Sequence, residues 1–568
     1  MKRIITIVCL ALAFAGIGWA AYRAVAPPAT PMSKFVPAGP LLYLEAKDFS
    51  SLLSAWNSSP QKGQWLRSSS YEVFSRSRLF LRLNGASDQF AAAAGLPPDM
   101  NFLSQVAGQR SALAIYDIGN MQFLYITYLP SAKAMETTLW QTRAKFEPRT
   151  AGGVNFYLRR DPESKREVAF AVSGDYLLLA TREDLMAGAL QLISGKQDRT
   201  IESEQWFAQS TSAAPQPGDL RLVLDLEKLV PNGYFRTYWV QQNITDLKQY
   251  SAAVSDLFRS DKQYREERVL LRKKDPDQSA SPAGRSAAAD LSCLVPDDAG
   301  VYEAMANPTS DASFALIETK LLAPHLGPAP ASQIAPQVQL TSGEQGGGSD
   351  LETRIDQSPA VQPQALQPIS ALKDLLDKTP LLASLQLQST ARDQAGVFIR
   401  IHSAVVLAAA ADWNESTVQS ALTDFIRPGL TAAQFGVAWQ PKSGYSQLDG
   451  LWPLAASVRG KYLLISDDPA LLESLLANLT RKSDRPPADL LAGFNHQREH
   501  GNFVRFTGLI DRPNTLSDNQ QNPNSEPQFF SGNMASLSST LAAVSSEKIE
   551  VRSEGAKVRQ SVTYEWSQ

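Results

Sequence analysis

Two spacings of apolar residues recur along the chain and predict strands and helices in turn. The segment 558–566 alternates apolar and polar positions, which is typical of a strand with one buried face. Residues 112–129 hold two apolar runs around a Gly-Asn pair, which predicts an antiparallel hairpin. Residues 185–193 and 471–479 have apolar residues at helical spacing, each directly after a strand-like run. We therefore predict an α+β fold, a mainly antiparallel sheet with helices packed on one face.

One segment of the sequence occurs twice. Residues 172–179 read VSGDYLLL and residues 458–465 read VRGKYLLI, an offset of 286. The match continues without a gap to residues 199 and 485, with ten identities over 28 positions. In each copy a glycine allows a tight turn, and the apolar run after it predicts a buried strand. A match of this length predicts two tandem copies of one module.

A second repeated motif shows where the copies differ in length. The dipeptide Val-Pro at 36–37, followed by a tyrosine six residues later, recurs at 295–296, an offset of 259. Since the offset grows by 286 − 259 = 27, the second copy holds about 27 extra residues between the two motifs. Residues 326–368 are rich in Pro, Gln, Ala and Gly, and we predict that this segment is the extra one, a mobile insertion.

These motifs divide the chain into four parts. The predicted parts are a membrane anchor or signal peptide with a Pro-rich stalk (1–34), the first copy (35–273), a linker rich in Asp, Ser, Ala and Pro (274–290) and the second copy (291–568).

The N-terminal segment predicts where the protein resides. An uncharged run of 19 residues begins at Ile4 and ends at Tyr22, preceded by Lys2 and Arg3 and followed by Arg23. About 20 apolar residues cross a bilayer, and the basic cluster ahead of them stays cytoplasmic. We therefore predict a single-pass membrane protein with its bulk outside the cytoplasm, periplasmic in a Gram-negative cell. Cleavage of the segment as a signal peptide, with secretion, is the alternative.

Charge and cysteine content narrow the possible partners. Lys plus Arg number 54 against 57 Asp plus Glu, so no basic excess exists to bind nucleic acid.

The two cysteines are Cys9, inside the apolar N-terminal run, and Cys293, so no internal disulfide is expected. Cys293 is predicted to be a buried small apolar residue, and His402 is predicted to face solvent from a strand.

Several of these features resemble a bacterial family of exported proteins known as domain of unknown function 3352. The resemblance comes from the Val36-Pro37-Ala38 opening that leads to Tyr43, and from the paired Val-x-Gly-x-Tyr-Leu-Leu strands that precede a helix. It covers most of the chain after the apolar N-terminal segment. It implies an N-terminally anchored, exported protein, and it implies no activity, cofactor or catalytic residue.

One motif has the form of a catalytic metal site. His496, Glu499 and His500 fit the H-x-x-E-H pattern of inverzincin peptidases, in which two histidines bind zinc and the glutamate activates a metal-bound water. Polar neighbours and a following glycine predict a solvated helix end instead. The first copy has Gln209 and Ala213 where the second has the histidines, so the motif is not part of the shared module. We therefore predict no catalytic residue, metal site or cofactor, and retain the motif only as a minor candidate.

The sequence leaves three functions open. Since no acid, base, nucleophile or metal cluster stands out, we expect a non-catalytic, membrane-anchored binding or scaffold protein with an envelope protein or lipid as partner. The first alternative, a carrier of lipid or another hydrophobic ligand, predicts a continuous apolar cavity. The second alternative, a zinc metallopeptidase, predicts a third ligand near His496 and His500.

Overall fold

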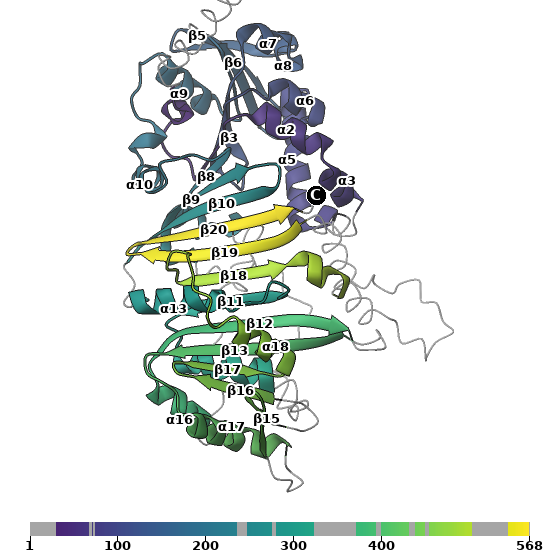
Figure 1. The fold of residues 1–568 in the computed structure, drawn as a ribbon. Helices are drawn as coiled ribbons and strands as arrows, with labels where there is room; N and C mark the ends of the chain where they lie inside the picture. Colours follow the sequence, from purple (N-terminus) through teal and green to yellow (C-terminus); the bar gives the residue numbers. More distant parts are fainter. Residues whose placement is uncertain are drawn as a thin grey trace, which may run out of the picture. The chain divides into compact units, whose positions relative to one another are not determined.

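The computed structural model describes much of the chain after residue 29 (Figure 1). The described residues are 30–67, 71, 74–235, 247–274, 280–322, 371–392, 399–430, 438–448, 454–502 and 544–566. They form helices and antiparallel strands in two compact units, the first containing residues 30–59 and 78–254 and the second residues 60–77 and 255–566. The predicted α+β class and antiparallel pairing are confirmed.

The first unit is built on an antiparallel sheet. Its strands run in the order β4, β5, β6, β7, β3, β2, β1, β8. Their bounds are β1 (Leu42–Ala46), β2 (Ser111–Asp117), β3 (Gln122–Tyr128), β4 (Glu147–Ala151), β5 (Val154–Arg160), β6 (Glu167–Ser173), β7 (Tyr176–Ala180) and β8 (Leu220–Asp225), and β9 (Tyr250–Arg259) follows at the end of the unit and continues into the second. The predicted hairpin of residues 112–129 is confirmed as β2 and β3.

Helices connect these strands. They are the 3-10 helices η1 (Met32–Phe35), η2 (Arg143–Lys145) and η3 (Ile201–Ser203) and the α-helices α2 (Phe49–Ser58), α5 (Arg78–Ala94), α6 (Met100–Val106), α7 (Ser131–Glu136), α8 (Thr138–Gln141), α9 (Glu183–Ile193), α10 (Gln205–Ala213) and α11 (Leu226–Leu229). Met32 is almost fully buried, so packed structure begins inside the predicted stalk, a few residues before the predicted start at residue 35.

The second unit has a closely similar sheet. Its strands run in the order β14, β15, β16, β17, β13, β12, β11, β18, β19, β20, β10. Their bounds are β10 (Gln263–Arg272), β11 (Val301–Ala306), β12 (Leu381–Arg392), β13 (Ile399–Ala409), β14 (Trp439–Pro441), β15 (Ser446–Leu448), β16 (Leu454–Arg459), β17 (Tyr462–Ser466), β18 (Leu490–Asn495), β19 (Val544–Glu554) and β20 (Lys557–Trp566). The order β4 to β8 in the first unit is repeated as β14 to β18 in the second.

The helices of the second unit include members on each face of its sheet. They are α3 (Pro60–Leu66), α13 (Pro282–Ser292), α14 (Ser310–Ile317), the π-helical η5 (Glu318–Leu322), α16 (Ala371–Lys378), α17 (Glu415–Leu430), α18 (Pro469–Ala477) and a helical stretch at 496–502. On β17, Leu464 packs in a core with α13 and α18, whereas Leu463 and Ile465 pack in a second core with α14, α16 and α17.

The prediction that helices pack on one face is therefore wrong. The cause is visible in the repeated segment itself, because Leu463, Leu464 and Ile465 are consecutive and all fully buried. Successive side chains of a strand point to opposite faces, so a continuous apolar run needs cover on both faces.

The predicted linker 274–290 is also partly wrong, because it contains most of α13. The Ser281 side chain caps this helix and Pro282 occupies its first turn. Ala288 and Ala289 are buried in the core of the second unit, so an alanine-rich composition marks a closely packed helix here. Cys293, at the C-cap of α13, is a half-buried free thiol.

Two predicted segments lie outside the described residues. They are the apolar run from Ile4 to Tyr22 and the insertion 326–368. Within the described part of the chain, no helix has both the length and the apolar character needed to cross a membrane.

The repeated turns give a test of the strand assignment. Gly174 and Gly460 both have φ of +56°, a left-handed conformation that costs about 1–2 kcal/mol for a residue with a Cβ atom. Gly85 is in α5, where an added Cβ would meet no atom within 4 Å. We predict that Gly174→Ala and Gly460→Ala each lower the free energy of unfolding by about 1–2 kcal/mol in urea titrations, whereas Gly85→Ala raises it by about 0.5–1 kcal/mol. Equal effects at all three positions would contradict the assigned turns.

Candidate functional site

The first unit contains an apolar cavity between its sheet and helices α5 and α6. Its volume is about 420 Å³, which lies within the range of about 300–1,000 Å³ typical of ligand pockets. The residues that line it are Leu44, Ala46, Phe49, Leu83, Ala86, Ser87, Gln89, Phe90, Ala93, Pro98, Phe102, Leu103, Val106, Ser111, Ala112, Leu113, Ile115, Asn120, Met121, Phe123, Tyr125, Arg166, Glu167, Val168, Leu179, Thr181 and Leu220.

Strand register places one row of apolar side chains along the cavity floor. Leu44 pairs with Leu113, Leu113 pairs with Tyr125, and Tyr125 pairs with Leu179. Directly paired residues of antiparallel strands project from the same face of the sheet. The row therefore crosses β1, β2, β3 and β7, and all four of its residues line the cavity.

Helix α5 forms the opposite wall with alternating large and small side chains. Leu83, Ala86, Phe90 and Ala93 line the cavity at steps of three, four and three residues, which is the spacing of one helical face. The methyl groups of the two alanines reach less far toward the sheet than a leucine would. Space therefore remains between α5 and the strands.

Polar atoms in the cavity wall already have protein partners. The Tyr125 hydroxyl donates to the Val106 carbonyl oxygen at 2.9 Å, and burial raises its pKa. The hydroxyl oxygens of Ser111 and Thr127 lie 2.6 Å apart in a hydrogen bond. The Thr181 hydroxyl oxygen accepts from the Phe123 backbone N–H at 2.8 Å. These polar groups need no hydrogen bond from a ligand, so the interior suits an apolar guest.

The cavity meets a polar pocket at one end. Asn120, Arg166, Glu167 and Thr181, here called the polar rim, line both the apolar cavity and a more polar pocket of about 760 Å³. The polar pocket is further lined by Gln122, Ser164, Lys165, Arg182, Glu183 and Asp184. An elongated guest in the cavity would thus have one end next to charged groups.

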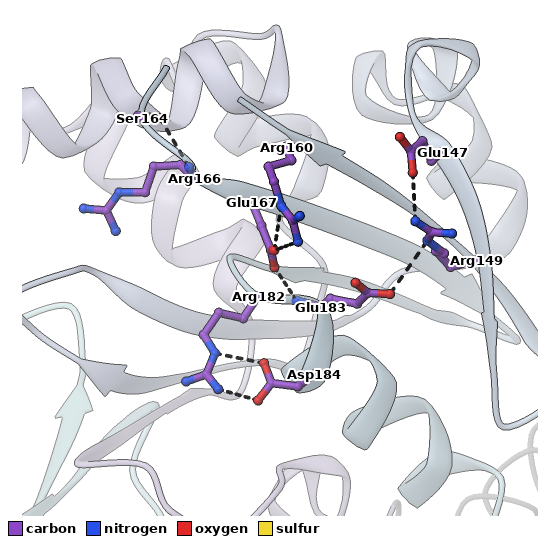
Figure 2. A network of polar contacts seen from close by, with 9 residues as sticks. All are labelled: Glu147, Arg149, Arg160, Ser164, Arg166, Glu167, Arg182, Glu183 and Asp184. Atoms are coloured by element: carbon purple, nitrogen blue, oxygen red, sulfur yellow. Dashed lines mark hydrogen bonds and ion pairs between the residues drawn. The ribbon is translucent and has the colours of Figure 1, made fainter. Parts of the chain in front are cut away.

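Most acids around the rim are paired with arginines (Figure 2). Glu167 accepts from the Arg160 guanidinium, with Nε at 3.0 Å, and from the Glu183 backbone N–H at 2.9 Å, at the start of α9. Asp184 is paired with Arg182, whose Nε lies 2.8 Å from Oδ1.

Arg166 differs from these arginines because its partners are neutral. Its Nε donates to Oε1 of Gln89 on α5 at 3.1 Å, and Nη1 donates to the Asn120 carbonyl oxygen. Burial alone would raise the pKa of Asp117, but hydrogen bonds from Asn120 and Gly119, together with the charge of Arg166, lower it. Arg166 therefore joins α5 to the β2–β3 hairpin at the cavity mouth.

The second unit does not repeat the apolar row. By the two repeat offsets and the strand registers, the positions of Leu44, Leu113, Tyr125 and Leu179 correspond to Glu303, Gln386, Val405 and Ile465. Val405 and Ile465 are fully buried in the core with α16 and α17. Glu303 and Gln386 line a smaller pocket of about 250 Å³ together with Lys320, Gln388 and Glu547, among others. The apolar row at these positions is thus specific to the first unit.

The His-x-x-Glu-His motif is helical, and its acid is engaged in the fold. Glu499 is buried, and its carboxylate accepts from the Thr390 backbone N–H at 3.2 Å, from the Thr390 hydroxyl and from the Arg498 guanidinium. The His496 ring lies against Phe494 with centroids 4.1 Å apart, and burial, with a smaller effect of His500, lowers its pKa. The expectation that the motif is solvated is wrong for Glu499, because β12 covers it. Across the described ranges, no group of three or more His, Cys, Asp or Glu is placed to hold a metal ion.

This arrangement predicts that Glu499 stabilises the fold. Replacement by alanine would leave the partly buried donors of Thr390 without their acceptor, at a cost of about 1–3 kcal/mol in the free energy of unfolding. Gln497, exposed on the same helix, is the matched control, and Gln497→Ala should change stability by less than about 0.5 kcal/mol. Metal content by mass spectrometry completes the test. One zinc per wild-type chain that is lost in His496→Ala would contradict a purely structural role of Glu499.

His402 lies near two acidic residues, Asp467 and Asp468. Its Nδ1 lies 3.6 Å from Oδ2 of Asp468, and its side chain is 29% exposed, so it is more buried than the predicted solvent-facing position. The neighbouring Asp467 accepts from the Ser403 backbone N–H at 2.7 Å, and burial raises the pKa of Asp467 to about 6.

Asp467 makes stability depend on pH. Because its folded-state pKa of about 6 exceeds the unfolded value of 3.8, the folded state binds more protons between about pH 4 and pH 6. Its contribution to stability therefore falls as pH rises through this window, by up to about 3 kcal/mol. We predict that Asp467→Asn removes this dependence in urea unfolding, and that Asp412→Asn at an exposed site leaves it intact. A slope unchanged in Asp467→Asn would contradict the assignment.

Comparisons with known proteins identify no family. No family model matches the chain, and no curated protein matches it. Among solved structures, crystal forms IV and I of the treponemal protein TP0453 match at 12% and 11% identity, each with a TM-score of 0.24. The matches cover 44% of this chain and 83% or 82% of TP0453. At these TM-scores the likeness carries no argument about fold or function.

Proposed function

We propose that this chain is a non-catalytic binding protein of the cell envelope that holds a lipid or another hydrophobic ligand in the apolar cavity of its first unit. The observation that carries the proposal is the cavity itself, about 420 Å³ of space lined mainly by apolar side chains. Each methylene group moved from water into such a site contributes about 0.8 kcal/mol. A chain of a few carbons is therefore enough to give useful affinity.

The satisfied polar atoms of the wall favour binding over catalysis. A catalytic pocket holds acids, bases or nucleophiles directed at the substrate. Here the Tyr125 hydroxyl and the Ser111 hydroxyl are engaged with protein groups, and the Glu167 carboxylate is held by Arg160 and the start of α9. Binding and release of an apolar molecule require none of these groups to change.

The repeat gives the two units different roles in this proposal. We interpret the shared strand order and the repeated sequence as two tandem copies of one module. The first copy provides the ligand site. The second copy, whose corresponding row contains Glu303 and Gln386, provides a packed scaffold.

The predicted location of the protein suits a lipid ligand. The predicted anchor from Ile4 to Tyr22 would keep the chain at the membrane surface with its bulk outside the cytoplasm. Membrane lipids would then be the most abundant hydrophobic molecules within reach.

Filling the cavity tests the proposal. Ala86 lines the cavity from α5, whereas Ala92 is exposed on the same helix. The full chain in lipid nanodiscs would be labelled with a photoreactive hexadecanol, and the labelled peptides identified by mass spectrometry. Ala86→Phe should reduce labelling of α5 and β3 at least tenfold, because excluding two methylene groups already costs about 1.6 kcal/mol.

The matched control is Ala92→Phe, which adds the same side chain outside the cavity and should leave labelling unchanged. Thermal unfolding of both variants checks that each is folded. Labelling of α5 and β3 that is equal in wild type and Ala86→Phe would show that the cavity does not hold the ligand.

A further inference from the structure

We infer that the ligand is a single-chain lipid with an anionic head, a carboxylate or a phosphate monoester, whose chain enters the cavity and whose head binds Arg166. The inference rests on the proposed function and specifies its ligand. The apolar interior does not specify the head group of the ligand. The charges at the polar rim do.

The charges at the cavity mouth are unequally compensated. The acids Glu167 and Asp184 are each paired with an arginine, Arg160 and Arg182 respectively. Glu183 lies 3.8 Å from the Arg149 guanidinium. Lys165 and Arg166, which end the turn between β5 and β6, form no ion pair with the residues that the structure describes. Arg166 of the polar rim and the neighbouring Lys165 thus have no carboxylate in direct contact among the described residues, and Arg166 acts on Asp117 through its charge alone.

Arg166 also has the geometry to receive an anion. It lines both the apolar cavity and the polar pocket, so a head bound to it would have its chain directed into the cavity. Its present acceptors, Gln89 Oε1 and the Asn120 carbonyl oxygen, are neutral. An ionised carboxylate or phosphate would bring a full negative charge to the guanidinium, and such pairs are often bidentate.

Other head groups fit the rim less well. A cationic head would face Lys165 and Arg166, while the nearby acids are already engaged. A neutral hydroxyl head would gain no more from Arg166 than the amide and carbonyl oxygens that it replaces. A single chain suits a cavity of about 420 Å³ that meets the polar pocket at the polar rim.

Binding of an anion would also act on the cavity mouth. Arg166 links Gln89 of α5 to the β2–β3 hairpin, and Arg82 of α5 donates to the Gly119 carbonyl oxygen of the same hairpin. A head group that draws Arg166 away would release one of these two links. The same side chain would thus hold the empty site together and recognise the ligand.

The test compares two photoreactive probes on the full chain in phosphatidylcholine nanodiscs, a diazirine palmitic acid and a diazirine hexadecanol. In wild type, the acid should label α5 and β3 about tenfold more than the alcohol. Arg166→Gln should abolish this preference, so that the acid and the alcohol label equally, and Arg166→Lys should restore most of it. Lys133→Gln removes an exposed cation elsewhere in the first unit and should have no effect.

Competition then distinguishes the head group. Unlabelled palmitate, hexadecyl phosphate, hexadecanol and hexadecylamine are added in turn, and the stronger of the two anions identifies a carboxylate or a phosphate site. Equal labelling by both probes, or a preference that survives Arg166→Gln, would overturn the anionic head and leave the hydrophobic site intact. Absence of cavity labelling by both probes would overturn the proposed function itself.

Discussion

The need to cover a continuous apolar strand on both faces determines how each unit is built. In β17, Leu463, Leu464 and Ile465 are all fully buried, so helices must pack against both sides of the sheet. The same requirement applies to β7, where Leu177, Leu178 and Leu179 are buried. The two units differ in how closely their helices pack against the sheet. In the second, leucines of α16 and α17 fill the space, whereas in the first the alanine-bearing face of α5 leaves a cavity.

The mouth of that cavity is polar where it meets the second pocket. The ion pairs of Glu167 and Asp184 organise the β5–β6 turn and the start of α9 without adding net negative charge. Arg166 remains among neutral acceptors between the two pockets. An apolar interior with a cationic end is the complement of an amphiphile with an anionic head, and this relation connects the packing of the unit to its proposed ligand.

Much of the fold was accessible from the sequence, whereas the candidate site was not. Local patterns were sufficient for the β2–β3 hairpin and for the repeated strands, because turn residues and apolar runs specify them directly. The consecutive leucines of β7 are typical of a strand that is buried on both faces. The prediction nevertheless placed helices on one face only. The Ala- and Pro-rich composition of residues 274–290 led to the prediction of a linker, whereas the alanines there pack closely in α13. In α5 the spacing of Leu83, Ala86, Phe90 and Ala93 is visible in the sequence, yet the space that it leaves depends on strands distant in the chain. Similarly, the burial of Glu499 depends on Thr390, more than 100 residues away.

The most direct test of this account is native mass spectrometry of the full chain purified from its host cells, followed by identification of any bound molecule. The account predicts about one single-chain lipid with an anionic head per chain, and its loss in Ala86→Phe. A chain that carries no lipid, or that carries the same lipid in Ala86→Phe, would contradict a ligand site in the first unit.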